Sequence, residues 1–229
     1  GHGDYRLITL APASVQEMAD FVGLGFELAF KYNNPAIILA DGVIGQMMEK
    51  VVLPPFQKRR TEEEIRKNCP WAALGKTADR KRNVITSLEL DPAVMEENNI
   101  RFQKKYKIIE KEEVRYEEIN CEDADYLIIA FGSMARIGQK AMELAREEGI
   151  KVGILRPITL WPFPTKAIAA YAEKVKGMLV TELNAGQMVE DVRLSVNGKV
   201  KVEHFGRLGG IVPDPEEIVS ALKEKLIEK

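Results

Sequence analysis

Cysteine and histidine are scarce in this chain of 229 residues, which carries only Cys69, Cys121, His2 and His204. No two cysteines form a C-x-x-C pair, so we expect no zinc site and no iron–sulfur cluster held by this chain. The isolated histidines exclude a multi-histidine metal site. We therefore predict no metal ligands here and interpret both cysteines as small buried side chains.

The chain also lacks long apolar runs and an excess of charge of one sign. Its 33 Lys and Arg balance 35 Asp and Glu, which gives no reason to expect a nucleic acid or an anionic membrane as partner. No signal peptide and no run of membrane-spanning length is present, so we predict a cytoplasmic protein. The many Glu and Lys residues, beside few Asn and Gln, are typical of a thermophile.

Residues 1–52 have the pattern strand, helix, strand. Apolar runs at 7–11 and 36–40 predict buried strands, and an apolar stripe over 15–30 predicts a helix between them that packs on the sheet. Ser14 and Glu17 have the spacing of a capping box. Because two parallel strands cannot cover themselves, we expect further strands upstream or on another chain.

Residues 53–118 interrupt their apolar runs with charge clusters and prolines. We interpret them as an exposed linker between domains, with a partner-binding arm as the alternative. From residue 119 to 229, strands at 126–131, 151–155, 178–183 and 200–205 alternate with helices. This alternation predicts an α/β domain with an open, mostly parallel sheet and helices on both faces.

Three segments together are similar to one known family. They are Gly1-His2-Gly3-Asp4-Tyr5-Arg6 before Leu10-Ala11-Pro12-Ala13-Ser14, then Arg156-Pro157-Ile158-Thr159-Leu160-Trp161-Pro162, and Thr181-Glu182-Leu183-Asn184-Ala185-Gly186-Gln187-Met188 with Gly206-Arg207-Leu208-Gly209-Gly210 behind it. In this order they resemble the α-subunit of 2-oxoacid:ferredoxin oxidoreductases of the 2-oxoglutarate or 2-oxoisovalerate type. The resemblance implies that 1–52 is the C-terminal part of a pyrimidine-binding thiamine domain. It implies that 119–229 is a transketolase-C-like domain.

The resemblance also implies cofactors and partners. Thiamine diphosphate and Mg²⁺ would sit mainly on a partner β-subunit, and iron–sulfur clusters on γ/δ or ferredoxin-like subunits. The assembly would use coenzyme A and ferredoxin, and the chain would be part of an oligomer. The family's activating glutamate would lie upstream of residue 1, so no catalytic residue is expected here and the chain alone would be inactive.

Two turns are candidates for cofactor contacts. Gly132-Ser133 opens a helix, where free N–H groups can bind an anion, but no G-x-G-x-x-G pattern accompanies it. Asp41-Gly42 follows Ala40, whereas thiamine enzymes hold the Mg²⁺–diphosphate with a Gly-Asp-Gly start. We interpret both as ordinary turns.

Five further residues are site candidates. His2 and Asp4 could border the thiamine cleft, or could fix the entry to the first strand. Asn184 and Gln187 have the spacing of a helix cap and its partner, with a subunit or ligand contact as the alternative. Trp161, among prolines, is expected to anchor domains or subunits. Two other functions stay open: another transketolase-like thiamine enzyme, and a non-catalytic α/β assembly module.

Overall fold

A computed structural model describes residues 3–56 and 58–228. The chain divides into two compact units. Residues 1–53 and 105–229 form the main unit, and residues 54–104 form the middle unit. None of the helices in the described ranges is long and apolar enough to cross a membrane.

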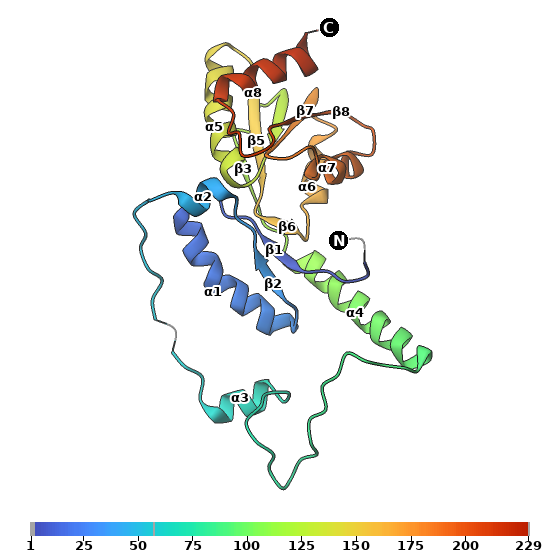
Figure 1. Cartoon of the computed structure of the whole chain (residues 1–229). Helices are drawn as coiled ribbons and strands as arrows, with labels where there is room; N and C mark the ends of the chain where they lie inside the picture. The colour runs from blue at the N-terminus through green and yellow to red at the C-terminus, as the bar shows by residue number, and fades with distance from the viewer. Residues whose placement is uncertain (1–2, 57, 229) are drawn as a thin grey trace. The chain divides into compact units, whose positions relative to one another are not determined.

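The main unit opens with the expected strand, helix and parallel strand (Figure 1). Strand β1 (Ile8–Leu10) pairs in parallel with β2 (Ala36–Ile38), and helix α1 (Val15–Tyr32) connects them. On its other edge β1 pairs antiparallel with β6 (Thr159–Trp161), giving the order β2-β1-β6. The sequence did not predict that the second half of the chain contributes a strand to this first sheet.

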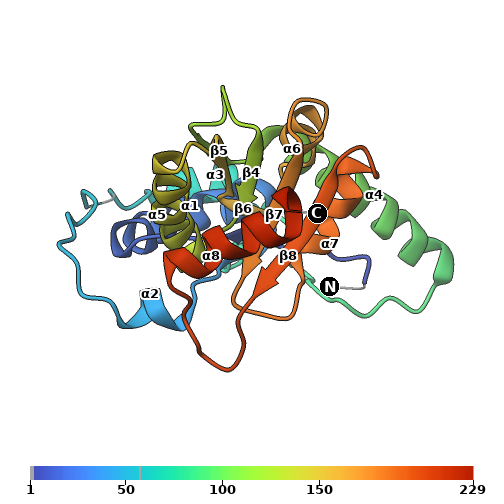
Figure 2. The ribbon, with the colours of Figure 1, turned by 90° about the horizontal axis from the view of Figure 1, so that it is seen from above.

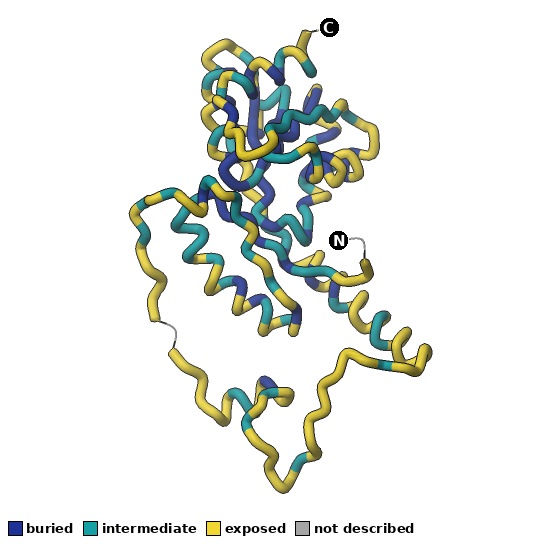
Figure 3. Tube along the Cα trace, viewed as in Figure 1, coloured by how far each residue is buried: buried dark blue, intermediate teal, exposed yellow. Residues whose placement is uncertain are grey.

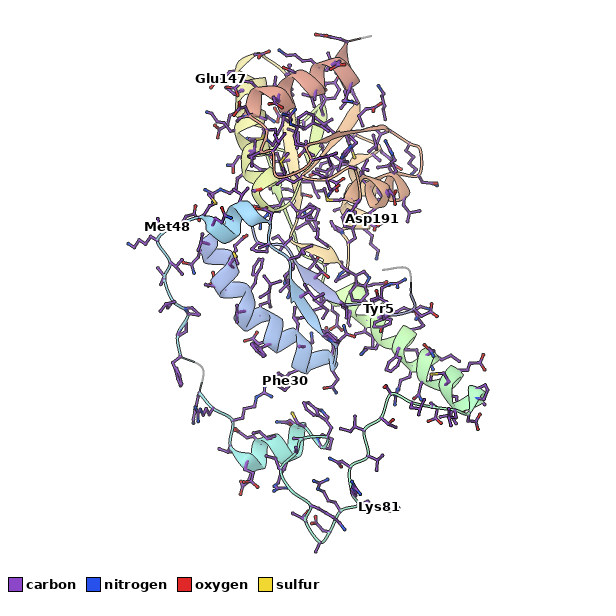
Figure 4. All side chains as sticks on the ribbon, viewed as in Figure 1. Tyr5, Phe30, Met48, Lys81, Glu147 and Asp191 are labelled. Atoms are coloured by element: carbon purple, nitrogen blue, oxygen red, sulfur yellow. The ribbon has the colours of Figure 1, made fainter. Side chains whose placement is uncertain are left out.

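Helix α1 does not turn its apolar stripe towards the sheet as predicted. It buries Gly25 and Leu28, while Val22, Phe26 and Phe30 are 48%, 65% and 46% exposed. Figure 4 labels Phe30 near the C-terminal end of this helix. Both faces of α1 are apolar, so the helical period alone could not show which one packs. That part of the prediction is wrong.

The second sheet has the order β3-β5-β4-β7-β8 and is parallel except at its first pair. The strands are β3 (Tyr116–Ile119), β4 (Tyr126–Ile129), β5 (Val152–Pro157), β7 (Gly177–Glu182) and β8 (Lys201–Gly206). The predicted open, mostly parallel α/β sheet is confirmed. The antiparallel edge strand β3 lies within 53–118, the range predicted as a linker, except for its last residue.

Helices cover both faces of this sheet, as the alternation of strands and helices predicted (Figures 1 and 2). Helices α5 (Gly132–Glu147) and α8 (Pro215–Leu222, continued by a π-helical turn at Lys223–Ile227) share a core with Ile128 and Ile154. Helices α6 (Thr165–Tyr171) and α7 (Met188–Val196) pack on the opposite face of the sheet. They contact the strand side chains that alternate with those of the first core. Alternate side chains of a strand point to opposite faces, so each strand serves both cores.

The middle unit contains helix α3 (Glu62–Asn68) and the start of helix α4 (Pro92–Glu112). Thr61 and Glu64 make the reciprocal bonds of a capping box at the start of α3. Of the residues that the structure describes between 54 and 104, Cys69 alone is buried. Figure 3 shows the exposed character of this segment. The domain boundaries at 52 and 118 stay predictions.

Candidate functional site

The carboxyl ends of β2, β4 and β7 meet beside a pocket of about 200 Å³, which we call the strand-end pocket. In open α/β sheets, ligands bind in the crevice outside the carboxyl ends of the strands, so this pocket is a natural position for a site. The lining residues come from those three strand ends and from α5: Leu39, Ala40, Asp41, Phe131, Met134, Thr181, Glu182, Leu183 and Asn184.

Asp41 joins the first sheet to the second. Its Oδ1 accepts hydrogen bonds from the N–H groups of Val43 and Ile44, both at 3.0 Å, and so caps helix α2 (Gly42–Gln46). Its Oδ2 accepts a 2.8 Å bond from the N–H of Ser133, at the start of α5. The interpretation of Asp41 as an ordinary turn residue is therefore wrong. The free N–H groups of α5 do bind an anion, and that anion is a side chain of the same chain.

Gly132 makes this close approach possible. Its φ of +61° lies in the left-handed region, and a Cβ here would stand 2.7 Å from Oδ2 of Asp41. Any other side chain would both strain the backbone and displace the carboxylate. Glycine at this turn thus serves the contact between Asp41 and α5.

Glu182 caps helix α7 from the end of β7. Its side chain is buried, and its carboxylate accepts bonds from the N–H of Gln187 (3.2 Å), of Met188 (2.8 Å) and of Val189 (3.0 Å). Asn184 instead accepts a 2.7 Å bond from the N–H of Gly186. The predicted capping by Asn184 and Gln187 is wrong, because α7 begins at Met188 and Gln187 makes no side-chain cap bond. A buried carboxylate needs several donors, and this was the signal that could have identified Glu182.

Three buried polar atoms near these caps have no hydrogen-bond partner among the described residues: Oγ of Ser133, Oγ1 of Thr181 and Nε2 of His204. The His204 nitrogen lies 3.8 Å from Oε1 of Glu182. Burial lowers the pKa of His204, and the nearby Glu182 charge opposes this effect. Thr181 lines the strand-end pocket, and its unpaired hydroxyl is buried.

A second joint between the two sheets is the ion pair of Glu17 with Arg156. The buried guanidinium donates to both carboxylate oxygens of Glu17 and, at 3.1 Å, to Glu117. Ser14 caps α1 by accepting from the N–H of Glu17 at 3.1 Å, as predicted. Glu17, however, bonds the N–H of Ala13 at 2.7 Å, so the capping box is only half formed. The carboxylate is shared between the helix start and Arg156.

Glu49 adds a third carboxylate to the same boundary. It accepts a 3.1 Å bond from the N–H of Val15 and a 2.7 Å bond from Arg136 on α5. The Val15 bond first, and the Arg136 bond second, lower the pKa of Glu49. The two sheets of the main unit are thus held together by acidic side chains of the first part, bonded to α5 and β5 of the second.

Trp161 lies where strand β6 meets the end of α4. Its ring contacts Tyr106 edge-on at a centroid distance of 5.7 Å and packs in the cluster that contains Ile8 and Ile109. It also borders a pocket of about 600 Å³, lined by Glu110, Lys111, Val114, Tyr116, Trp161, Pro162, Phe163, Pro164, Thr165, Lys166 and Ala167. Trp161 therefore joins two parts of this chain, and its contact with another subunit stays a prediction.

A buried acid fixes the end of α4 to the end of α1. Glu113, 3% exposed, accepts hydrogen bonds from Lys31 (2.7 Å) and from the Tyr32 hydroxyl (2.6 Å), and forms a 2.8 Å ion pair with Arg115. Burial raises the pKa of Glu113, but the bonds from Lys31, Tyr32 and Arg115 outweigh it and lower the pKa to about 2. Burial and the same Glu113 raise the pKa of Tyr32 to about 12.

Of the two predicted thiamine-cleft residues, the structure describes only Asp4. His2 lies outside the described residues, and Asp4 is exposed ahead of β1. The described residues contain no group of three His, Cys, Asp or Glu side chains placed to hold a metal ion. Asp41 is a single carboxylate here, and its oxygens already accept three N–H bonds. The donor set that this structure describes therefore does not fit the Mg²⁺–diphosphate group.

Two family profiles match consecutive parts of the chain. The profile of the pyruvate flavodoxin/ferredoxin oxidoreductase, thiamine diphosphate-binding domain matches residues 2–120, and that of pyruvate:ferredoxin oxidoreductase core domain II matches residues 124–218. The chain belongs to the pyruvate:ferredoxin oxidoreductase family. The first profile covers β1 and β2 of the first sheet but not β6. The second profile runs from β4 to the start of α8.

Curated relatives in this family are subunits of 2-oxoacid oxidoreductases. The ketoisovalerate oxidoreductase subunit VorB of Methanothermobacter marburgensis is 44% identical over 98% of this chain and 62% of its own length. The 2-oxoglutarate synthase subunit KorA of Archaeoglobus fulgidus is 33% identical over 98% of this chain and 63% of its own length. The chain thus spans less than two thirds of these relatives.

Solved structures agree with this placement. The 2-oxoglutarate:ferredoxin oxidoreductase from Magnetococcus marinus, with 2-oxoglutarate, coenzyme A and succinyl-CoA bound, matches 99% of this chain and 43% of its own at a TM-score of 0.77 and 26% identity. A split gene transketolase, as an inactive beta4 tetramer, matches 96% of this chain and 57% of its own at a TM-score of 0.52 and 13% identity. The second match shows the fold alone, and the predicted transketolase-like fold is confirmed.

Proposed function

We propose that this chain is part of the α-subunit of a thiamine diphosphate-dependent 2-oxoacid:ferredoxin oxidoreductase. In the proposed reaction a 2-oxoacid and the thiol of coenzyme A give an acyl thioester, CO₂ and a proton, and the two electrons released pass to ferredoxin. The observation that carries the proposal is the 44% identity to a ketoisovalerate oxidoreductase subunit along nearly the whole chain. The α designation stays a prediction, because relatives carry both VorB and KorA names.

The identities favour a branched-chain 2-oxoacid such as 2-oxoisovalerate over 2-oxoglutarate. The VorB relative is 44% identical, whereas a KorA relative from a second organism reaches 33% over the same 98% of this chain. The two acids differ by a carboxylate, so a pocket suited to one should reject the other strongly.

Within that assembly, we assign this chain a supporting role at the cofactor. Thiamine diphosphate, when bound, supplies the carbanion chemistry for decarboxylation. Its diphosphate and Mg²⁺ would be held mainly by a partner β-subunit, and the iron–sulfur clusters by γ/δ or ferredoxin-like subunits. This division is supported by Asp41, whose carboxylate oxygens already accept N–H bonds at two helix starts. The described residues instead orient two sheets that would border the cofactor, with His2 and Asp4 as candidate edge residues.

We also propose that the chain works as an obligate oligomer or heteromer in the cytoplasm. Contacts through the first 50 residues and Trp161, and secondarily through Asn184 and Gln187, would join it to its partners. The exposed apolar side chains on α1 support this proposal, because large exposed apolar patches commonly mark protein interfaces.

The decisive experiment assembles the chain, within its complete subunit, with the neighbouring β- and ferredoxin-like subunits. We expect coenzyme A-dependent reduction of ferredoxin with 2-oxoisovalerate, and a much lower kcat/KM with 2-oxoglutarate. Absence of reduction with every 2-oxoacid tested in a complex loaded with cofactor would overturn the proposed activity.

A titration of the isolated chain tests the division of labour separately. Calorimetry with thiamine diphosphate and Mg²⁺ should show no stoichiometric micromolar site on this chain alone. A tight site there would show that the cofactor is held here, and would overturn the assignment of Mg²⁺–diphosphate to the partner while leaving the proposed reaction intact.

A further inference from the structure

The Trp161 pocket, as we call the pocket of about 600 Å³ beside Trp161, has the properties of a small-molecule site. All of its lining residues belong to the main unit. Small-molecule sites commonly have volumes of about 300–1,000 Å³ and mostly apolar walls with a few polar groups. Here the walls include the rings of Tyr116, Trp161 and Phe163, beside two prolines. Such walls suit a ligand that has a flat ring.

The aromatic walls are held in place by the strands that carry them. Tyr116 begins β3, which pairs with β5, and Trp161 ends β6 and packs edge-on against Tyr106. The N–H of Arg115, just before β3, donates a 2.9 Å bond to Oγ1 of Thr159 at the start of β6. A ligand would therefore meet walls that need little rearrangement, which lowers the free-energy cost of binding.

The charged groups of the Trp161 pocket are unused, in contrast to those of the strand-end pocket. Lys111, Lys166 and Glu110 are exposed, and none of them forms an ion pair with the residues that the structure describes. In the strand-end pocket the carboxylates of Asp41 and Glu182 already accept N–H bonds at helix starts. The Trp161 pocket therefore keeps its charges for a ligand.

These charges favour a ligand with one phosphate group. Lysine binds phosphate as a point charge, whereas the planar fork of arginine suits a carboxylate, and no arginine is among the described residues that line this pocket. A phosphate monoester carries about −1.5 to −2 charges at pH 7, which Lys111 and Lys166 together balance. The Glu110 carboxylate opposes further phosphates and can accept hydrogen bonds from the hydroxyl groups of a ribose.

We propose that the Trp161 pocket binds a purine nucleoside monophosphate, with its base against the aromatic walls and its phosphate beside Lys111 and Lys166. Stacking on aromatic side chains tolerates any base, and a purine offers the larger face. Coenzyme A ends in the same nucleotide chemistry, but its several phosphate groups carry more charge than the two lysines balance. This site goes beyond the proposed function and does not depend on the 2-oxoacid reaction.

The test titrates the full chain with AMP. Calorimetry measures the affinity, and the fluorescence of Trp161 in a Trp71→Phe background reports whether binding takes place at this pocket. We expect saturable binding that changes the Trp161 fluorescence and weakens with added salt. Adenosine and ribose 5-phosphate, which each lack one half of the ligand, should bind at least about tenfold more weakly than AMP. Coenzyme A should also bind more weakly than AMP.

Three variants separate the two halves of the site. Lys111→Ala with Lys166→Ala removes the phosphate partners, and Tyr116→Leu removes one ring but keeps an apolar wall. The matched control, Lys50→Ala with Lys151→Ala, removes the same charge from exposed positions outside the pocket. All these positions are exposed, so circular dichroism and the melting transition should not change. We expect the first two variants to bind AMP about tenfold more weakly and the control to bind it as the unmodified chain does.

Four results would overturn the proposal. They are the absence of saturable AMP binding by the full chain, binding that leaves the Trp161 fluorescence unchanged, a control that weakens binding as much as the pocket lysine variant, and coenzyme A binding at least as tightly as AMP. The last result would assign the pocket to the nucleotide end of coenzyme A instead of a free mononucleotide.

Discussion

Replacing Asp41 with alanine tests the joint between the two sheets most directly. The substitution removes the cap of α2, which typically costs about 1 kcal/mol. It also leaves the N–H of Ser133, a residue 4% exposed, without its acceptor, which costs a further 1–3 kcal/mol or so. We therefore expect the free energy of unfolding to fall by about 2–4 kcal/mol. Asp41→Asn, which can still cap α2, should lose about half as much.

Urea denaturation followed by the fluorescence of Trp161, in a Trp71→Phe background, measures this loss. Thr61→Ala is the matched control, because it removes a cap from α3, a helix with no buried residues. That control should leave the midpoint of the main transition unchanged. A loss of less than about 0.5 kcal/mol in Asp41→Ala, similar to the control, would refute the claim that Asp41 holds α5.

A double-mutant cycle sharpens the test. Gly132→Ala alone should be strongly destabilising, because its Cβ would meet Asp41 Oδ2 in a left-handed backbone conformation. In the Asp41→Ala background only the backbone strain remains. The losses of the two single variants should therefore sum to more than the loss of the double variant. A double variant whose loss equals that sum would contradict the contact.

The remaining contacts support four further predictions. Glu182→Ala should lower the free energy of unfolding by about 3 kcal/mol or more, measured by urea denaturation, because the buried N–H groups at the start of α7 lose their acceptor; Glu203→Ala on β8, a partly exposed glutamate that caps no helix, is the control. The pKa of Glu113, about 2 in the folded chain, lies below its ordinary 4.5, so the stabilisation it provides is full above pH 4.5 and is lost as the pH falls towards 2. Glu113→Gln should remove about 1–3 kcal/mol at pH 7 and flatten that part of the stability–pH curve; an unchanged curve would contradict the buried ion pair. Burial raises the pKa of Cys121 to about 11, so in a Cys69→Ser variant its thiol should react with disulfide reagents at neutral pH only after unfolding. Residues 119–229 expressed alone should melt cooperatively, and a broad transition with strong dye binding would move the predicted boundary.

Most of the second sheet could be predicted, because its strands and helices are visible as patterns in short stretches of sequence. Strands β4, β5 and β7 are short apolar runs that are almost fully buried, and they alternate with helices that have their own inner faces, so both periods are visible in the sequence. The antiparallel strand β3 was missed because Tyr116–Ile119 is rich in charge, with its glutamates exposed at the sheet edge. Strand β6 was missed because Pro162 and Pro164 made its surroundings look like a turn.

The site could be predicted less well, since its key contacts join residues far apart in the chain. Asp41 meets Ser133 and Glu17 meets Arg156 across the boundary between the sheets, and no spacing rule connects such positions. The helix cap at α7 was assigned to Asn184 because capping rules look for short polar side chains at the helix start. Here the longer side chain of Glu182, at the end of β7, accepts hydrogen bonds from the N–H groups at the start of α7.

The path of the chain through the main unit has a practical consequence. Residues 1–53 and 105–229 belong to one compact body, although 51 residues separate them in sequence. The pairing of β1 with β6, and the bonds of Asp41 and Glu17, tie the two pieces together without the intervening peptide. A protease cut between residues 54 and 104 should therefore nick the polypeptide yet leave both fragments co-eluting as one particle. The main unit could therefore be assembled from two separately encoded polypeptides as well as from one.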